Sequence, residues 1–300
     1  MTPRCFSVPD DRSVFHRLAI AWRTSDDAAA GQRAALKRAA APLPARLRPV
    51  QTTWTHAAGA SRLVATLPEA GAEAWSEAAA GTLHTRPDEV THPVVVAVGP
   101  GEPEKFGAAL ARDLRGMEGT DHKVVSSLRQ KRQEGTEHTT VIGPDPAAKA
   151  GHAATFVALS ALLAGPNRTL QDVLQEAGLP ATATLSRRLL NGTPAVAWTF
   201  TVPAGAEGRG IYDIIDVVGD FSRNVVAEPE PAIAFAGANL RRAWQSPSGL
   251  AETIAKYEAM GWGGCIVHDP DTAVRDAAPN LRAAFVGLLE PLAEVLGAAA

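Results

Sequence analysis

The chain has 300 residues, of which 46% are hydrophobic and 20% are charged, and this length is sufficient for two ordinary domains with a core. The formal net charge of −3 gives no electrostatic basis for binding nucleic acid or an anionic membrane. No apolar run approaches the roughly 18 residues that a membrane span needs, and the first residues lack the apolar stretch of a signal peptide, so we expect a cytoplasmic protein.

The first part of the chain alternates strand-like and helix-like segments. Alanine-rich sequence favours a helix by propensity, and a fully apolar run such as PVVVAVG is typical of a buried strand. A turn is expected near Ala58 and Gly59, and a helix end near Gly81. The predicted elements are a strand (13–24), a helix (28–40), a hairpin (52–68), a helix (69–84), a strand (93–100) and a helix (about 103–115).

A polar segment at residues 116–137 interrupts this pattern. It carries Lys123, Arg129, Lys131 and Arg132 and has glycine near both ends, which is typical of an interdomain linker. The alternation then restarts, with Asn191-Gly192 as a tight-turn signal. The predicted elements are a strand (139–143), two helices (151–165 and 169–178), a hairpin (181–203), a helix (210–226), a long helical region (about 230–262) and a final helix (from 279).

The order strand, helix, hairpin, helix occurs twice, at residues 18–84 and 139–226. This recurrence predicts an α+β protein of two duplicated domains, the first abbreviated, each a mainly antiparallel sheet packed with helices. The expected division is a first domain at 1–118, a linker at 119–137 and a second domain at 138–300.

Several stretches resemble the insulinase or pitrilysin-type family of zinc metallopeptidases, which includes the mitochondrial processing peptidases. LAIAWRTSDDAAAGQRAALKRAA (18–40) resembles the strand and zinc helix of the family. LLAGPNRTLQDVLQEAGLPATATLS (162–186) resembles its second-domain glycine loop, arginine, helix and strand. LRRAWQSPSGLAETIAKYEAMGWG (240–263) resembles the helix before its C-terminal segment. The resemblance covers most of the chain and implies a metallopeptidase fold of the LuxS/MPP type.

The resemblance also implies where a zinc site would lie. The family motif H-x-x-E-H supplies two imidazole ligands and a general base from one helix, and its positions fall here on Ala34, Lys37 and Arg38. Alanine has no donor atom, and two cations would repel a zinc ion. The segment that would carry a more distant glutamate ligand is also missing. We therefore expect no catalytic zinc, no other cofactor and a catalytically degenerate member.

Some members of this family work in pairs, in which one subunit has lost the zinc motif and holds the substrate backbone with an arginine and a tyrosine. Arg168 remains in the comparable stretch, but Leu179, Pro180 and Ala181 occupy the tyrosine region. The chain thus departs from this helper pattern as well. Peptide docking at these four residues is left open by the resemblance.

Two further clusters contain catalytic residue types. His84, Glu89 and His92 lie within HTRPDEVTH, but Pro87 and Pro93 preclude the helical spacing of a zinc motif, so an exposed loop is expected.

The chain has two cysteines, too far apart for a disulfide framework or a zinc knuckle. Cys265 lies near His268 and could form a nucleophile pair, although a buried structural cysteine is the simpler interpretation.

Two functional hypotheses follow. The first is a non-catalytic subunit that forms a heterodimer with an active zinc-peptidase relative and helps enclose or dock a peptide, for which sheet edges suffice. The alternative is an active peptidase that uses an unaligned metal site or the Cys265 and His268 pair. A third possibility is a homodimer that binds no peptide.

Overall fold

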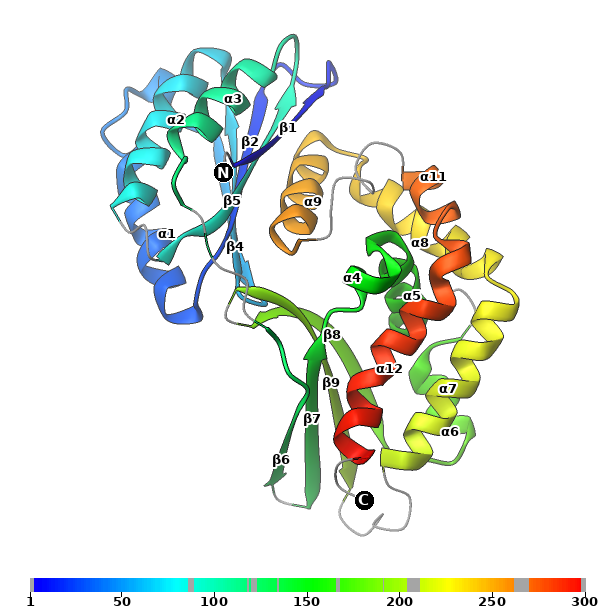
Figure 1. Cartoon of the computed structure of the whole chain (residues 1–300). Helices are drawn as coiled ribbons and strands as arrows, with labels where there is room; N and C mark the ends of the chain where they lie inside the picture. The colour runs from blue at the N-terminus through cyan, green and yellow to red at the C-terminus, as the bar shows by residue number, and fades with distance from the viewer. Residues whose placement is uncertain are drawn as a thin grey trace. The chain divides into compact units, whose positions relative to one another are not determined.

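A computed structural model describes residues 3–85, 89–117, 119, 123–133, 135–165, 168–190, 192–203, 211–261 and 270–297. The chain forms two compact units, each with one β-sheet packed with helices (Figure 1). Unit 1 comprises Met1–His122, Leu189–Thr193 and Arg242–Trp262, and unit 2 comprises Lys123–Arg188, Pro194–Arg241 and Gly263–Ala300. The predicted α+β fold with two helix-packed sheets is confirmed.

Unit 1 contains a five-stranded sheet with the order β1-β5-β2-β4-β3. β1 runs parallel to β5, and the other neighbouring strands are antiparallel. The strands are β1 Arg4–Pro9, β2 His16–Arg23, β3 Gln51–Ala57, β4 Ala60–Leu67 and β5 Thr91–Gly99. The helices are α1 Asp26–Ala40, α2 Glu69–His84, α3 Glu104–Asp113 and α9 Pro247–Ala259, with a short 3-10 turn, η1, at Ala45–Leu47.

The two faces of this sheet are covered by different helices. Leu18, Ile20 and Trp22 of β2 belong to a core that includes residues of α1, α2 and α3. The intervening Ala19 and Ala21 point to the other face and are fully buried, because α9 packs there on β2, β4 and β5 (Figure 1). Burial on both faces explains why the central strands are almost entirely apolar.

Gln32 attaches α1 to the sheet through three hydrogen bonds. Its Oε1 accepts from the Trp22 indole N–H at 2.9 Å. Its Nε2 donates to Thr24 Oγ1 at 3.1 Å and to the Glu89 carbonyl at 3.0 Å. The amide is 2% exposed, and such a buried polar group is tolerated because its hydrogen bonds are made.

Polar contacts of the sheet hold α9 in place. Arg17 Nε donates to Ser248 Oγ at 3.0 Å, and Arg62 lies 3.6 Å from the Glu252 carboxylate. Burial lowers the pKa of Arg62. Burial, and then the charge of Arg62, also lower the pKa of Lys256 on the same helix. Arg17 and Arg62 lie beneath this helix and are half-buried, so their hydroxyl and carboxylate partners matter more than those of surface pairs.

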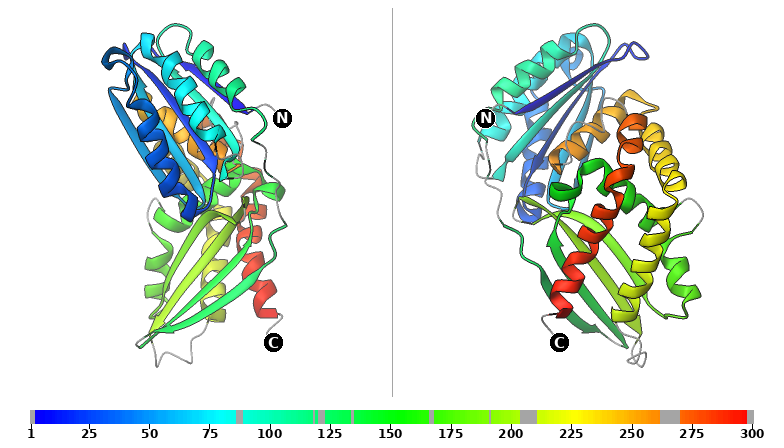
Figure 2. Two further views of the ribbon diagram at one scale, coloured as in Figure 1. Left: turned by 90° about the vertical axis from the view of Figure 1, so that its left-hand side faces the viewer. Right: turned by 45° about the vertical axis from the view of Figure 1, so that its right-hand side comes forward.

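Unit 2 contains a four-stranded sheet with the order β6-β7-β9-β8. Its described helices lie on one side of the sheet (Figure 2). The strands are β6 Ser127–Gln133, β7 Thr136–Pro144, β8 Thr182–Leu190 and β9 Thr193–Pro203. The helices are α4 Ala147–Ala150, α5 His152–Ala164, α6 Leu170–Glu176, α7 Ile211–Ala227, α8 Glu230–Ala243, α11 Pro270–Arg275 and α12 Leu281–Gly297.

The helix side of this second sheet carries its aromatic residues. Trp198 and Phe200 stack with their ring centroids 5.8 Å apart, and the Trp198 indole N–H donates to the Leu288 carbonyl of α12 at 2.8 Å. Arg187 Nε donates to Asp145 Oδ2 at 2.5 Å, and both side chains are buried. Asp145 Oδ1 also accepts from the first backbone N–H of α4 at 2.9 Å, so this one carboxylate has two structural roles.

The strand order of the predicted repeat recurs in the two units. In each, the first strand pairs antiparallel with the second arm of the following hairpin: β2 with β4, and β7 with β9. The first arm of each hairpin, β3 or β8, then lies at the edge of the sheet. Within the described residues no helix is both long and apolar enough to cross a bilayer.

Two strands differ from the sequence prediction. Residues 127–133, expected to lie in a linker, form β6, because backbone hydrogen bonds to β7 hold this polar segment without an apolar face. β1 was not predicted, since none of its residues is fully buried and its apolar pattern is weak. α2 has the predicted bounds of 69–84, although an end near Gly81 was also expected. The division of the chain at residues 118 and 138 stays a prediction.

Two glycines of α2 provide a matched pair for a test of packing. A β-carbon at Gly71 would lie 2.5 Å from the Leu47 backbone carbonyl oxygen, whereas one at Gly81 would meet nothing within 4 Å. We expect Gly71→Ala to lower the free energy of unfolding by roughly 1–3 kcal/mol through overpacking, and Gly81→Ala to raise it by about 0.5–1 kcal/mol through helix propensity. Urea unfolding measures both, and shifts of the same sign would contradict the close approach of η1 to α2.

His16 gives the stability of unit 1 a dependence on pH. Its side chain is buried against Phe106, with ring centroids 4.7 Å apart, and this burial lowers its pKa. The unfolded chain therefore binds the proton more readily, so the contribution of neutral His16 is present above the unfolded pKa and is lost as the pH falls. We expect His16→Gln to lose less stability than the parent between pH 7.5 and pH 5, as measured by urea midpoints. Identical losses would contradict this assignment.

Candidate functional site

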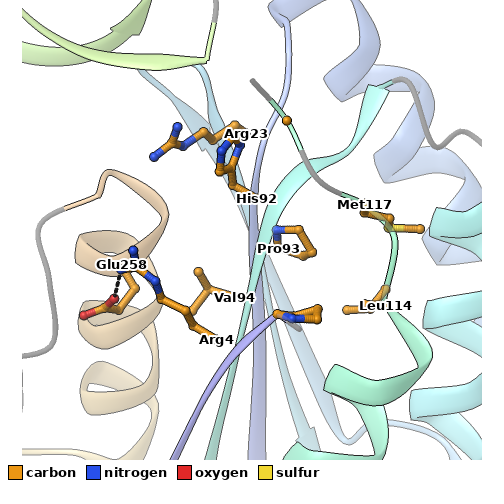
Figure 3. Close-up of a pocket in the computed structure, with 10 residues that line it drawn as sticks. Arg4, Arg23, His92, Pro93, Val94, Leu114, Met117 and Glu258 are labelled. Atoms are coloured by element: carbon orange, nitrogen blue, oxygen red, sulfur yellow. Dashed lines mark hydrogen bonds and ion pairs between the residues drawn. The ribbon is translucent and has the colours of Figure 1, made fainter. Parts of the chain in front are cut away.

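A cavity of about 170 Å³ lies in unit 1 beside the first residues of β1 and β5 (Figure 3). Pro93, Val94, Leu114 and Met117 form its apolar wall. Its volume is below the roughly 300–1,000 Å³ of typical small-molecule sites. The cavity therefore suits one apolar side chain or a small ion better than a cofactor.

An ion pair borders the cavity on the side of α9. Arg4 Nη1 donates to Glu258 Oε2 at 2.9 Å (Figure 3). The Glu258 side chain is fully buried, whereas that of Arg4 is 59% exposed. Because a buried carboxylate without a cation would be costly, Arg4 neutralises Glu258 and also joins β1 to α9.

Arg23 forms another part of the cavity lining. Its Nε donates to the Ala259 carbonyl at 3.0 Å, and its Nη1 donates to the Gly192 carbonyl. The last carbonyls of a helix have no partner inside the helix, and a cation near them is favourable. Arg23 is thus a C-terminal cap for α9, and it presents a guanidinium to the cavity at the same time.

His92 lies in the cavity lining with an unusual backbone conformation. Its φ of 50° is in the left-handed region. Residues other than glycine adopt this conformation only where the surrounding structure stabilises it. Its N–H donates to the Met117 carbonyl at 3.1 Å. A β-carbon at Gly119 would lie 2.6 Å from His92 Cε1, so this glycine allows the backbone to pass close to the imidazole ring.

The chemistry available in the cavity is that of binding. Its described lining includes two guanidinium groups, one imidazole and one paired carboxylate, and no serine, threonine or cysteine is among these described residues. An imidazole can move a proton, but covalent catalysis also needs a nucleophile within hydrogen-bond reach. The described lining offers groups that can bind a side chain or a small anion.

The predicted zinc-helix positions are all exposed. Ala34, Lys37 and Arg38 lie on the outer face of α1, and none of them lines the cavity. Lys37 and Arg38 are in the last turn of the helix, where positive charge favours helix stability. Their assignment as former zinc positions stays a prediction.

His84, Glu89 and His92 of HTRPDEVTH do not come together in the structure. His84 contacts the Asp113 carbonyl at the end of α3, and Glu89 contributes its backbone carbonyl to Gln32, so only His92 lines the cavity. In the part of the chain that the structure describes, no three His, Cys, Asp or Glu side chains are grouped so that they could hold a metal ion. Cys265 and His268 lie outside the described residues.

The predicted peptide-binding residues surround α6 in unit 2. Arg168 forms an ion pair with Glu176, and both are solvent-exposed. Leu179 and Ala181 are buried and Pro180 is exposed. The Leu179 N–H donates to the Leu174 carbonyl at 3.0 Å, and the Ala181 carbonyl accepts from Gln171 Nε2 at 3.1 Å. Leu179 and Ala181 thus support α6, while a role of the four residues in peptide binding stays a prediction.

Sequence reasoning did not select Arg4, Arg23 or Glu258. The only available signal was a charged residue at the end of an otherwise apolar strand, as at Arg23. The partners of Arg4 and Arg23 on α9 are more than 230 residues away in the chain, so no local pattern connects them.

No protein-family model matches the sequence, and no curated protein does either. Solved structures do resemble the chain. The inactive domain of a peptidase M16 from Pseudomonas fluorescens has a TM-score of 0.60 and 10% identity, over 95% of this chain and 92% of that one.

A protease from Helicobacter pylori has a TM-score of 0.54 and 12% identity, over 95% of this chain and 96% of that one. A chain of complex III2 from Candida albicans has a TM-score of 0.51 and 9% identity, over 93% of this chain and 88% of that one. Identities this low establish the fold alone. The chain has the α+β architecture of M16 peptidase domains along nearly its whole length.

Proposed function

We propose that this chain is a non-catalytic M16 peptidase-like subunit that pairs with an active zinc-peptidase relative and helps to dock a peptide. The observation that carries the proposal is the likeness to a domain described as an inactive M16 peptidase, with a TM-score of 0.60 over 95% of the chain. Membership of the family, heterodimeric assembly and a cytoplasmic location are parts of the proposal.

The composition of α1 supports the absence of catalysis. At the positions where the family resemblance expects ligands, the helix carries Ala34, Lys37 and Arg38, and all three are exposed. The two consecutive cations Lys37 and Arg38 would repel a divalent ion. The opposite face of α1, with Gln32 and Leu36, is buried, so packing alone is sufficient reason to retain the helix.

Two features of unit 1 support peptide docking. The cavity accepts a single side chain next to two guanidinium groups. β3 is a terminal strand of its sheet, and a terminal strand can bind an extended peptide through backbone hydrogen bonds. Neither feature requires a catalytic residue, so docking survives the loss of a metal site.

The proposal predicts that the chain does not hold zinc. After expression in zinc-supplemented medium, we expect the purified full chain to contain well below one equivalent of zinc by elemental mass spectrometry. Chelation should leave its thermal midpoint unchanged, because no bound ion stabilises the fold. An active M16 peptidase prepared in parallel is the control. One equivalent of zinc, lost together with peptidase activity on chelation, would establish the active-enzyme alternative instead.

The proposal also predicts a partner. Coexpression with an M16 peptidase that has an intact H-x-x-E-H helix should give a 1:1 complex by size-exclusion chromatography with light scattering. The kcat/KM of the partner for extended peptides should rise in the complex. The same partner with its catalytic glutamate changed to glutamine should still assemble, because docking does not depend on chemistry. A monomer or a homodimer in the presence of every such relative of the same genome would overturn the proposal.

A further inference from the structure

One face of the four-stranded sheet in unit 2 carries no described helix. α5, α7 and α12 lie on the other side in Figure 1, and the left panel of Figure 2 shows the strands of this sheet in front of those helices. The open face belongs to β6, β7, β9 and β8 in that order.

The register of the strands aligns polar side chains in two rows on this face. Arg129 lies opposite Thr140, which lies opposite Thr199. Lys131 lies opposite His138, which lies opposite Thr201. Directly opposed residues of antiparallel strands point to the same side of a sheet. These six residues, Arg129, Lys131, His138, Thr140, Thr199 and Thr201, are here named the basic threonine face.

The residues between them point to the helices. Thr139 lies opposite Phe200, and Val141 lies opposite Trp198; all four of these side chains are buried. In contrast, Arg129 and Lys131 are exposed, and the other four members of the basic threonine face are half-buried. The aromatic side chains of this sheet are thus on its covered side, whereas Arg129 and Lys131 and the hydroxyls of the basic threonine face are on its open side.

Hydrogen bonds fix the centre of the basic threonine face. His138 Nδ1 lies 3.0 Å from Thr201 Oγ1, and its Nε2 lies 3.3 Å from Thr136 Oγ1. Thr140 and Thr199 join their hydroxyls at 3.4 Å. Thr182 and Thr184 of β8 are exposed beside them, and Thr184 Oγ1 donates to the Thr199 carbonyl at 3.5 Å. The hydroxyls are held in place before a ligand arrives, which lowers the entropic cost of binding.

The charge of the basic threonine face is not compensated within the described residues. No carboxylate stands in its two rows, and among the described ion pairs none involves Arg129 or Lys131. Other exposed cations of unit 2 do have carboxylate partners, such as Lys149 with Glu290 and Arg241 with Asp271. The chain as a whole has 32 acidic and 29 basic residues. A face whose charged residues are all cations therefore differs from the nearly balanced charge of the whole chain.

We propose that the basic threonine face docks an acidic segment of an extended polypeptide. Carboxylates of the peptide pair with Arg129 and Lys131, and its backbone amides and carbonyls bind the threonine hydroxyls. The inference rests on the proposed docking function and adds to it the chemical class of the peptide, which is rich in aspartate and glutamate.

A single-stranded nucleic acid is the competing anionic ligand, and the chemistry of the face disfavours it. Proteins that bind single strands combine cations with aromatic side chains on which the bases stack. The aromatic residues of this sheet, Trp198 and Phe200, are fully buried on the helix side. The basic threonine face offers hydroxyls, two cations and one imidazole, whose ring nitrogens already contact threonines.

Binding of synthetic peptides to the purified full chain tests the proposal without any partner subunit. The probes are a twelve-residue Asp/Glu/Gly/Ser peptide with a neutral fluorophore, its Asn/Gln counterpart, and a single-stranded oligonucleotide of the same charge. We expect the acidic peptide to bind at 50 mM salt, to bind at least tenfold more weakly at 300 mM salt as screening predicts, and to bind more tightly than either comparison probe.

Charge reversal locates the site. Arg129→Glu with Lys131→Glu should weaken acidic-peptide binding at least tenfold. The matched control is Arg275→Glu with Arg282→Glu, which reverses two exposed cations of the same unit and should change binding less than twofold. Circular dichroism and thermal midpoints verify folding, and Arg129→Gln with Lys131→Gln replaces the first pair if it does not fold.

Unchanged binding by the Arg129 and Lys131 variants would overturn the proposal, as would tighter binding of the oligonucleotide. A loss of self-association in these variants, without a loss of peptide binding, would assign the face to a second copy of this chain. These assays need no zinc peptidase, so they test peptide binding independently of subunit pairing. If the chain binds the acidic peptide but does not pair with any zinc-peptidase relative, the proposed pairing is refuted and the proposed peptide-binding site is retained.

Discussion

The attachment of α9 to the first sheet is the interaction on which the structure of unit 1 depends. A helix from near residue 250 closes a face that strands from the first hundred residues leave open. Small side chains make this possible, with Ala19 and Ala21 beneath and Ala251 and Ala255 above, all fully buried. Polar contacts at the ends and sides of the helix then fix its position. A unit without α9 would expose an apolar sheet face to water, which is unfavourable in proportion to its area.

This arrangement accounts for the position of the cavity as well. Arg4 and Arg23 line it because they reach toward the buried carboxylate and the terminal carbonyls of α9. A guanidinium that serves as a helix cap is held rigidly, and it presents its remaining edge in a defined direction. The cavity is therefore a consequence of how the helix is attached, and its basic character follows from the same requirement.

Local patterns in the sequence were sufficient for most of the elements and for the fold class. The hairpin at 51–67, the apolar strand β5 and the alanine-rich α1 each have a period or turn that is complete within a few residues. β6 escaped prediction because its strand conformation depends on pairing with β7, and SLRQKRQ has no apolar face of its own. The cavity could not be predicted, since Glu258 and Arg4 are brought together only by the tertiary fold.

The three hydrogen bonds of Gln32 fix the rotation of α1 about its own axis. Because this amide joins Trp22, Thr24 and the carbonyl of Glu89 at once, the helix cannot rotate about its axis without breaking all three. A single core residue therefore sets the rotation of the helix about its axis. The same residue determines that Ala34 and Arg38 face the solvent. New side chains at these exposed positions would therefore face bulk water, and turning them toward the sheet would require a different anchor in the core.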